Sequence, residues 1–284
     1  MVNIEQTRQI SRLMKTSDKK ISGLLHQKSS ALHYQLRRYL PEPSLAPLIE
    51  QFWLVDWDLR GLPAHTQQNV PDPNMHLVIS NQGVKLLGPV SKKYRFTMQG
   101  QGKIIAVKFN LGVLAKRLPC PLDKVLDTEF DATEIFEFDQ QKLIKNTLNA
   151  KSDKAAVTYL SHELQNSIIQ EDPWLSKVQI LVEQIKNNQE INRVEILAEL
   201  SHTSVRNIQR LFKTYVGFPP KWLIRKCRLH HALEMLENQQ ISLAELATTL
   251  EYADQSHLIR DFNKFLNITP KQYASANALL KSHL

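Results

Sequence analysis

The fold is decided by two neighbouring stretches, LAELSHTSVRNIQRLFKTYVGFPPKWLIRKCRLHHALEMLEN (197–238) and SLAELATTLEYADQSHLIRDFNKFLNITPKQY (242–273). They are two copies of one pattern, because Leu197-Ala198 recurs as Leu246-Ala247. The second copy gains one residue in its turn, after which the offset settles at fifty residues. The pairs at that offset are Leu200 with Leu250, Ile208 with Leu258, Arg210 with Arg260, Phe212 with Phe262, Tyr215 with Phe265, and Pro220 with Pro270. This repetition predicts two tandem modules, each a short helix, a tight turn and a second helix.

Capping residues and apolar spacing support these helices. Ser204 and Asp254 stand where a small hydrogen-bonding side chain caps a helix N-terminus. Apolar residues then recur at helical spacing, and we expect these rows to be core, because one stripe of each helix must be buried. Between the modules, residues 220–237 predict one long helix of about 27 Å. Such a rod could hold two recognition helices about one DNA turn, roughly 34 Å, apart.

The opposite face of each second helix carries side chains that read nucleic-acid bases. Arginine pairs with guanine, asparagine and glutamine pair with adenine, and a helix N-terminus accepts a phosphate. A helix that presents these groups after a tight turn has the geometry of a recognition helix in a major groove. The candidate DNA-binding residues are Arg206, Asn207, Gln209, Arg210 and Lys213 in the first module, and Gln255, Ser256, His257, Arg260 and Lys264 in the second.

The charge is concentrated in the same region. The chain has 36 Lys+Arg against 28 Asp+Glu, a net charge of +8, yet no Asp or Glu occurs from Leu200 to Leu233. An uncompensated run of cations suits a polyanion, because each neutralised phosphate releases counterions. A solvated helix surface is the alternative interpretation of charge alone. The cations of this run are Arg206, Arg210, Lys213, Lys221, Arg225, Lys226 and Arg228.

These stretches closely resemble the double helix-turn-helix DNA-binding domain of AraC/XylS-type transcriptional regulators. The resemblance rests on the segments QRLFK (209–213), GFPP (217–220), DQSHLIRDF (254–262) and ITPKQY (268–273), within about 75 residues. One position departs from the family, because the turn residue that is often glycine there is Glu251 in the second module and Ser201 or His202 in the first.

The resemblance implies a regulator that reads two consecutive grooves. By it, Arg206, Gln209 and Arg210 would face bases in one groove, and Gln255, Ser256, His257 and Arg260 would serve the second. It implies double-stranded promoter DNA and RNA polymerase as partners, and activation more often than repression.

The residues upstream predict a β-rich domain. MHLVIS (75–80), VKLLGPV (84–90), YRFTM (94–98) and KIIAVKFN (103–110) are short β-rich runs divided by Gly, Asn and Pro. The run from Tyr34 to Phe109 also looks like the cupin-like N-terminal domain of one subgroup of these regulators. We therefore predict an α+β chain, a small β-rich cupin-like barrel followed by an all-α double helix-turn-helix domain. The expected parts are a basic, mobile N-terminal arm (1–33), a sensor or dimerisation domain (34–110), a helical bridge (111–172) and the DNA-binding domain (173–284).

A barrel in front of a DNA reader suggests a sensor for a small-molecule effector. The candidate effector-pocket residues are His65, Asp72 and His76. The two histidines lie outside any dense metal-ligand motif, so we expect neither a metal nor another cofactor. Trp53 and Trp57 are expected in the barrel core rather than in a pocket. A regulator without an effector, in which this domain is purely structural, and a possible homodimer joined by the helical bridge stay open.

Composition excludes several other classes. Two cysteines and 8 glycines do not suit a disulfide scaffold or a collagen-like chain. No window supplies about 18 consecutive apolar residues, so we expect a soluble, cytoplasmic protein with no membrane partner. The rival enzyme reading is DNA-repair alkyl transfer to Cys120, but Pro121 and Leu122 replace the His-Arg that follows the acceptor cysteine in such proteins, and we expect no catalytic residue. Cys227 lies between Lys226 and Arg228, whose charges favour a thiolate, but a cysteine within a helix is usually inert.

Overall fold

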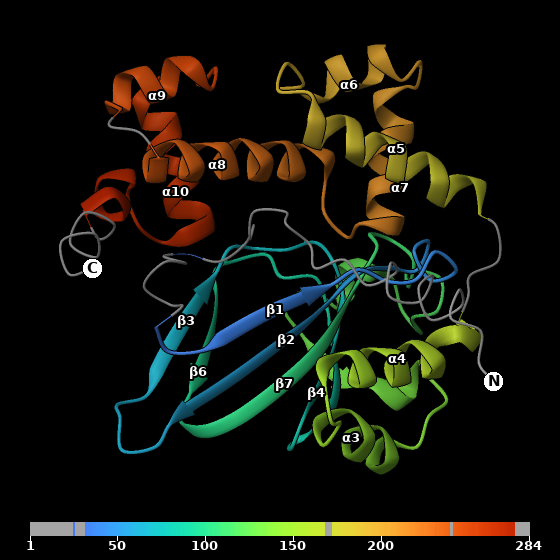
Figure 1. Cartoon of the computed structure of the whole chain (residues 1–284). Coiled ribbons are helices and arrows are strands. Elements are labelled where there is room, and N and C mark those ends of the chain that lie inside the picture. Colours follow the sequence, from blue (N-terminus) through green and yellow to red (C-terminus); the bar gives the residue numbers. More distant parts are fainter. Residues whose placement is uncertain (1–24, 26–31, 168–171, 239–240, 276–284) are drawn as a thin grey trace, which may run out of the picture.

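The computed structural model of the chain describes residue 25 and residues 32–167, 172–238 and 241–275 (Figure 1). An antiparallel, β-rich N-terminal half lies against an all-α C-terminal half, and this confirms the predicted α+β fold class. The basic arm expected over residues 1–33 lies outside the described residues, apart from Leu25, Leu32 and His33. The N-terminal half contains β1 (Gln35–Tyr39), β2 (Ile49–Leu59), β3 (His65–Asn69), β4 (His76–Ser80), β5 (Gly83–Leu87), β6 (Tyr94–Met98), β7 (Gly100–Phe109), β8 (Glu129–Asp131), α3 (Gln140–Leu148) and α4 (Asp153–Leu164).

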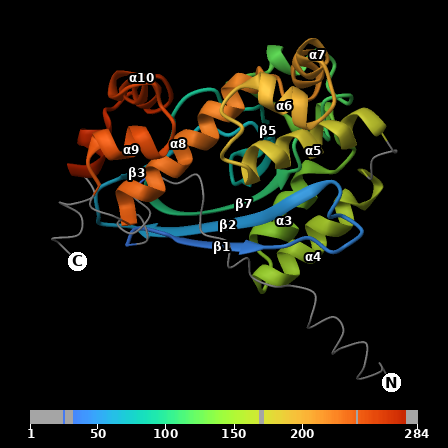
Figure 2. The same cartoon turned by 90° about the horizontal axis from the view of Figure 1, so that it is seen from above.

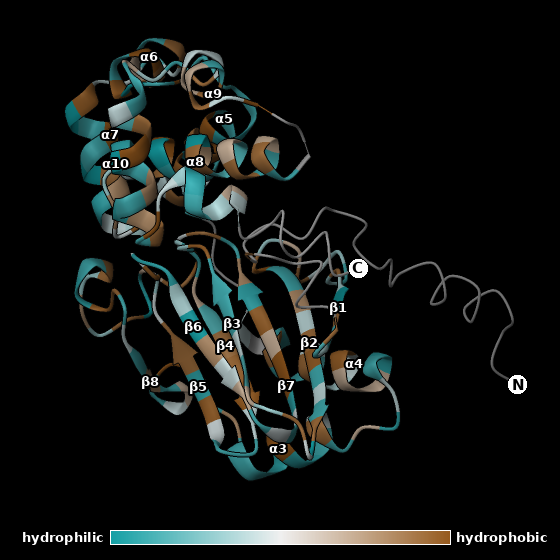
Figure 3. Cartoon of the chain, turned by 90° about the vertical axis from the view of Figure 1, so that its left-hand side faces the viewer, coloured by the Kyte–Doolittle hydropathy of each residue, from teal (hydrophilic) through white to brown (hydrophobic). Residues whose placement is uncertain are grey.

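Most strands form one six-stranded antiparallel sheet in the order β1-β2-β7-β4-β5-β8. Buried and less buried side chains alternate along β4 and β5; in β4, Leu77 and Ile79 are buried while their neighbours are partly exposed. Figure 3 shows hydrophobic and hydrophilic bands along the strands. The central strand β7 differs, because Ile104 to Val107 are all buried. The apolar runs predicted as strands form β4 to β7.

The two faces of the six-stranded sheet are covered by different elements. The helices α3 and α4 cover one face, where Leu77, Leu143 and Leu160 belong to a single core. The two-stranded sheet of β3 and β6 faces the other side, where Val55 and Met98 form a smaller apolar cluster. The N-terminal half is therefore a sandwich whose larger core lies on the helical side.

Residues 111–172 differ from the helical bridge that the sequence predicts. In the described part of this segment, residues 111–167 and 172, α3 and α4 are the only α-helices, and both pack onto the sheet instead of spanning between the halves (Figure 1). The strand β8 extends the sheet, because Glu129, Phe130 and Asp131 pair with β5. The domain boundary predicted at residue 110 does not separate two cores, because Phe136 and Leu143, which follow it, belong to the same hydrophobic core as the sheet.

The C-terminal half places two helix pairs on a central rod. Its elements are α5 (Pro173–Asn187), α6 (Val194–Leu200), α7 (Val205–Tyr215), α8 (Pro220–Asn238), α9 (Leu243–Thr249) and α10 (Gln255–Leu266). In the view from above, α8 runs diagonally between the pair α6–α7 and the pair α9–α10 (Figure 2). The predicted helix-turn-helix modules and the long connecting helix are therefore confirmed. None of these helices, nor any other in the described part of the chain, is long and apolar enough to cross a membrane.

Both modules turn through the same backbone motif. His202 and Glu251 have φ angles of 48° and 53°, in the left-handed region that glycine normally occupies. His202, and not Ser201, is therefore the turn residue of the first module. The N–H of Thr203 donates to Ala198 (3.0 Å) and that of Tyr252 to Ala247 (2.9 Å), which are the closing bonds of a Schellman motif.

The motif also corrects the sequence alignment of the two copies. The C-cap residues of α6 and α9 are Ser201 and Leu250, so Leu250 corresponds to Ser201 and not to Leu200. The offset stays at 49 through the turn and becomes fifty only at the N-caps of α7 and α10. The additional residue of the second copy is therefore Ala253.

The two halves share a core. Val216 and Phe218, which follow α7, belong to the same buried cluster as Leu122 and Leu114 of the N-terminal half. At Gly217 a Cβ atom would lie 3.2 Å from Leu126, so the loop after α7 packs closely against the N-terminal half. On the other side, the N–H of Lys93 donates to the carbonyl of Phe265, and Val70 packs with residues of the second module.

Candidate nucleic-acid interface

The recognition helix of the first module, α7, is exposed along one face. Arg206, Gln209, Arg210 and Lys213 are exposed at helical spacing, whereas Asn207 is half-buried. The N-cap is confirmed, because the Ser204 hydroxyl accepts a hydrogen bond from the Asn207 N–H at 3.3 Å. The opposite face is buried through Ile208, Leu211, Phe212 and Tyr215. Four of the five predicted residues therefore lie together on a solvent-exposed surface.

The recognition helix of the second module, α10, repeats this arrangement. Gln255, Ser256, Arg260 and Lys264 are exposed. His257 is half-buried and its ring lies edge-on to that of Tyr252, with the centroids 5.3 Å apart. The Asp254 carboxylate caps the helix by accepting from the His257 N–H at 2.7 Å, which confirms the predicted N-cap.

The repeat also identifies surface residues that sequence reasoning did not select. Ile259 stands where α7 has Gln209, Asn263 where it has Lys213, and Thr214 where α10 has Lys264. Asn263 and Thr214 are exposed and Ile259 is partly exposed. Applying the offset of fifty to every candidate would have identified all three.

Not every cation of the predicted run faces solvent. The Arg225 guanidinium donates to Asp261 of α10, with its Nε 2.8 Å from Oδ1, and Asp261 is completely buried. The Tyr252 hydroxyl donates to the other carboxylate oxygen at 3.3 Å. Burial and the Asp261 charge raise the pKa of Tyr252. Arg225 is therefore part of the packing between α8 and α10, and its charge is neutralised.

Two neighbouring cations are also directed into the protein. Arg228 donates to the carbonyl of Asn192 at 3.1 Å and lies over the ring of Tyr252, 4.9 Å from its centroid. Lys226 is close enough to Asp72 of the N-terminal half to lower the pKa of that carboxyl. The seven cations predicted as one uncompensated face thus divide into exposed groups on α7 and at the start of α8, where Lys221 lies, and partly buried groups in the middle of α8. The middle of α8 packs between the second module and the N-terminal half.

The rod α8 sets the spacing of the two recognition helices. Its 19 residues correspond to about 28 Å. Figures 2 and 3 show α7 and α10 on the same side of α8, with the exposed helix pair α6 and α9 next to them. The length of α8 is of the same order as one turn of DNA, roughly 34 Å.

Among the predicted effector-pocket residues, Asp72 and His76 are brought together. His76 Nε2 lies 3.5 Å from Asp72, and the indole N–H of Trp53 donates to the other ring nitrogen at 3.4 Å. Lys108 Nζ lies 3.0 Å from Asp72 and 3.3 Å from Glu50. Burial alone would raise the pKa of Asp72, but Lys108, His76 and Lys226 outweigh it and hold this pKa well below its usual range.

His65 stands apart from that pair. It begins β3, whereas Asp72 follows the far end of the same strand, about 20 Å away along an extended chain. Its ring stacks on His33 with centroids 4.1 Å apart, and burial is the main cause that lowers its pKa. Within the described residues, no three His, Cys, Asp or Glu side chains are grouped as a metal site would require.

The tryptophans and cysteines occupy packing positions. Trp53 and Trp57 are both partly buried against the cluster between the two sheets, as expected for the core. Trp57 also lines the open depression described below, so the expectation that it would not line a pocket is wrong. Cys120 packs at the edge of the main core. The cations beside Cys227 do not favour a thiolate here, because burial raises the pKa of this thiol and outweighs the adjacent Lys226.

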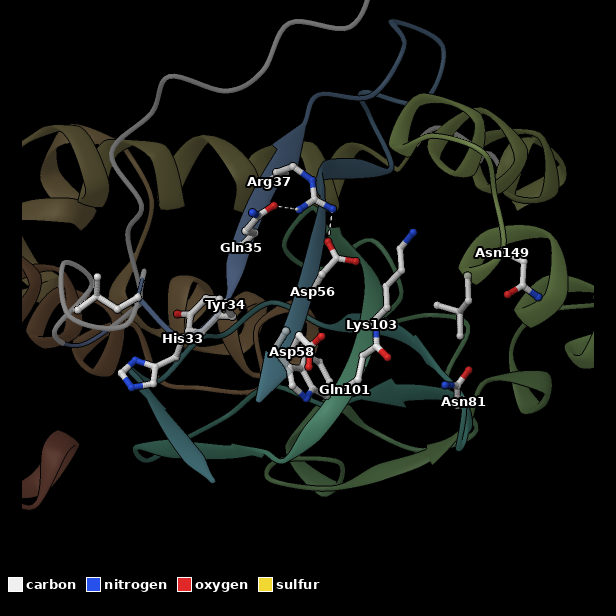
Figure 4. Close-up of a pocket in the computed structure, with 14 residues that line it drawn as sticks. His33, Tyr34, Gln35, Arg37, Asp56, Asp58, Asn81, Gln101, Lys103 and Asn149 are labelled. Atoms are coloured by element: carbon white, nitrogen blue, oxygen red, sulfur yellow. Dashed lines mark hydrogen bonds and ion pairs between the residues drawn. The ribbon is translucent and has the colours of Figure 1, made fainter. Parts of the chain in front are cut away.

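An open depression of about 770 Å³ lies on the face of the sheet that carries α3 and α4, beside the ends of these helices (Figure 4). Arg37, Asp56 and Lys103 line it from β1, β2 and β7, and Asn149 lines it from the end of α3. Arg37 pairs with Asp56 and with Asp153 of α4. Arg37 is partly buried, and the two aspartates neutralise its charge. Because Asp153 lies on α4, the ion pairs connect α4 to the sheet. None of the predicted effector residues lines this depression.

Two family comparisons match separate parts of the chain. Residues 197–276 match the helix-turn-helix domain, and residues 37–131 match a domain of unknown function. The first match begins within α6 and includes α7 to α10, and the second begins within β1 and includes β2 to β8. The C-terminal part of the chain is therefore a helix-turn-helix domain of the AraC type.

Similar proteins are named as regulators. An uncharacterized HTH-type transcriptional regulator of Haemophilus influenzae is 27% identical over 142 residues, which cover 48% of this chain and 47% of that protein. The F1 operon positive regulatory protein of Yersinia pestis is 33% identical over 98 residues, covering 34% of this chain and 33% of that protein. The matches thus span half or less of these relatives. A solved structure of a ToxT variant from Vibrio cholerae has 13% identity and a TM-score of 0.39, and the match covers 78% of this chain and 96% of that one.

Proposed function

We infer, from the AraC-type helix-turn-helix domain that residues 197–276 form, that this chain is a sequence-specific DNA-binding transcriptional regulator. The observation that carries the proposal is the matched surface of α7 and α10. Both helices present exposed polar and basic groups, Arg210 and Arg260 occupy equivalent positions, and both helices lie on one side of α8. We propose that they read two consecutive major grooves.

The proposed contacts divide by chemistry. Arg206, Gln209 and Arg210 of α7 and Gln255, Ser256 and Arg260 of α10 are proposed to reach base edges, because their donors and acceptors suit bidentate pairing. Lys213 and Lys264 lie one turn further along and are proposed to contact phosphates. The half-buried Asn207 and His257 are proposed to support these contacts from the helix starts.

Control by the N-terminal half is a further part of the proposal. The group formed by Asp72, His76, Lys108 and Lys226 connects the sheet to α8, the rod that spaces the recognition helices. We propose that a small effector or a second copy of the chain acts on DNA binding through this contact between the halves. RNA polymerase is the proposed partner for activation at a promoter.

The test is selection of bound fragments from random and genomic DNA with the full-length protein. We expect an enriched motif of two boxes about ten base pairs apart, centre to centre. A double variant, Arg210→Ala with Arg260→Ala, should lose that motif. The matched control is Lys142→Ala with Lys145→Ala, which removes the same charge from exposed positions on α3, at the far end of the molecule (Figure 1).

The outcomes separate specific from general binding. Loss of the motif in the arginine variant with retention in the α3 variant supports the proposal. Equal enrichment by all three proteins, or binding that falls equally on every sequence, would show that α7 and α10 contribute charge alone. In that case the chain would be a non-specific DNA-binding protein.

A further inference from the structure

An exposed tryptophan stands beside the recognition helix of the first module. Trp174 lies in the first turn of α5 and leaves 49% of its surface exposed. The Arg210 guanidinium lies over its ring, with Cζ 5.4 Å from the ring centroid. A guanidinium within about 6 Å of an indole face is attracted by the ring quadrupole.

Arg210 is held from a second direction as well. One of its terminal nitrogens donates to the Asn207 side-chain carbonyl at 2.9 Å. The ring of Trp174 and the amide of Asn207 together restrict a side chain that otherwise samples many rotamers. Neither contact uses all of the five N–H donors of arginine, so donors remain for a base edge.

The turn that carries Trp174 is itself firmly anchored. The Asp172 carboxylate caps α5 by accepting from the N–H groups of Trp174 (3.0 Å) and Leu175 (3.4 Å). It also accepts from Lys116 of the N-terminal half (2.6 Å) and from the Tyr215 hydroxyl at the end of α7 (2.7 Å). Burial opposes ionisation of Asp172, but these bonds outweigh it and lower its pKa. The ring is therefore placed by a hub that joins α5, α7 and the N-terminal half.

The second module does not repeat this arrangement in the part of the chain that the structure describes. Arg260 donates from Nε to the carbonyl of Ser256, 3.2 Å away within its own helix, and none of the cation–π contacts found involves it. The two equivalent arginines therefore differ in their surroundings. Arg210 is covered by an aromatic ring and bonded to the Asn207 side chain, whereas Arg260 is bonded to a main-chain carbonyl of its own helix.

We propose that Trp174 is a positioning residue that orders Arg210 for base recognition, so that it determines sequence specificity at the first box without contacting DNA. The inference rests on the proposed function, in which Arg210 reads a base. Ordering a flexible side chain opposes binding, and an arginine that is already ordered loses less entropy on reaching the base. Removal of the ring should weaken binding to the specific site about three- to tenfold.

The first experiment requires no DNA. In the free full-length protein, the ring of Trp174 should shift the Arg210 Hε resonance upfield, and the Arg210 Nε–H vector should be more ordered than in the Trp174→Ala variant. Trp174→Ala and Trp174→Leu should abolish the upfield shift and leave only the restraint from Asn207, while Trp174→Phe should retain part of the shift. An Arg210 resonance and order parameter that are the same in the native protein and in Trp174→Ala would overturn the proposal, whatever the fate of the proposed function.

The second experiment is a double-mutant cycle on the duplex recovered by fragment selection. Trp174→Ala should weaken binding to that duplex, relax the base preference in the first box only, and leave binding to random duplex and the salt dependence unchanged. In an Arg210→Ala background the same substitution should have no further effect, because its action passes through Arg210. Additive losses would overturn the proposal and assign Trp174 a separate contact. A loss of the second-box preference would equally overturn it.

Discussion

The two helix-turn-helix modules share a pattern of sequence but are stabilised in different ways. In the first module, Ile208 and Phe212 of α7 belong to the same core as the sheet of the N-terminal half. In the second, Leu258 and Phe262 at the equivalent positions belong to a separate cluster with α8 and α9. The repeated apolar spacing therefore specifies the helices of each module. The core that their buried side chains join depends on the elements that pack against that module.

Charge is used differently as well. The second module buries Asp261 against Arg225, whereas the equivalent position in the first is the apolar Leu211. The second module also begins with a capping box at Ser242 and Glu245, whereas Arg193 at the start of α6 provides no side-chain cap. The second module has the smaller apolar core, and the buried ion pair and the capping box add polar interactions that stabilise it.

The largest effect is expected from breaking the buried ion pair of the second module. Asp261→Ala should lower the free energy of unfolding by about 3–5 kcal/mol, because Arg225 is then left without its partner charge. Urea denaturation of the full chain measures it. Replacing both members, Asp261→Leu with Arg225→Leu, should restore most of the loss and make the second module resemble the first. A single variant within about 1 kcal/mol of the native protein would show that the pair does not hold the module.

The next effect concerns the two equivalent arginines on DNA. Arg210→Ala and Arg260→Ala should each cost about 1–3 kcal/mol at the specific site, each relaxing base preference in one box only. Fluorescence anisotropy on duplexes with one box scrambled measures this. Because Arg210 alone lies over an aromatic ring, its loss should be the greater. Equal losses of affinity for specific and random duplexes would show that both arginines contact phosphates and not base edges.

The left-handed turn residues should give a gain in stability. His202→Gly is expected to stabilise the protein by about 1 kcal/mol, since glycine adopts a positive φ without steric cost. Glu251→Gly should gain less, because the Glu251 carboxylate also accepts a hydrogen bond from the Asn192 side chain. Thermal unfolding compares the two. A destabilised His202→Gly would indicate that the imidazole makes a stabilising interaction in the native state.

The helix starts allow an exchange of caps between modules. Ser242→Ala should destabilise α9 by about 1 kcal/mol through loss of its capping box, and Arg193→Ser should stabilise α6 by up to a similar amount. Hydrogen exchange in the first turns of α6 and α9 reports each effect locally. If a substitution in one module changed the hydrogen-exchange protection of the helix in the other module, the two modules would be coupled more tightly than their separate cores indicate.

The smallest effect is expected at Lys213, where the second module has Asn263. Lys213→Ala should weaken binding almost equally on all sequences and reduce the slope of log K against log salt by about one. Asn263→Ala is the matched control and should leave the slope unchanged, because asparagine carries no charge to release a counterion. A slope unaffected by Lys213→Ala would remove this lysine from the phosphate contacts.

The sequence predicted the C-terminal half well because its signals are local. Ser204 and Asp254 cap helices from adjacent positions, and the apolar rows repeat at the helical period within one segment. It predicted β4 to β7 for the same reason, as short apolar runs. The strand β3, with sequence HTQQN, was missed because its side chains are polar and only its partner β6 makes it a strand.

The parts that sequence reasoning could not predict depend on contacts between distant residues. Arg225 and Asp261 are separated by 36 positions, and each alone looks like an ordinary surface charge. Trp174 and Arg210 are just as far apart. The exposed surfaces of α7 and α10 were largely predicted, because exposure follows from the helical period, whereas the internal direction of Arg225 and Arg228 follows from the packing of α8. The specific DNA contacts themselves stay predictions.

The division of the core along α8 has a consequence for how the molecule comes apart. Leu223 and Ile224 belong to the core shared with the N-terminal half, and Leu229 and Leu233 belong to that of the second module. The border between two cooperative units therefore falls inside a helix, near Cys227, and not at a linker. We expect the second module to unfold locally while α7 stays folded with the sheet. Chimaeras that exchange the whole DNA-binding half at residue 172 would cut through the larger core, whereas an exchange of residues beyond the middle of α8 would leave that core intact and divide only the smaller cluster, to which Leu25 and Val70 contribute.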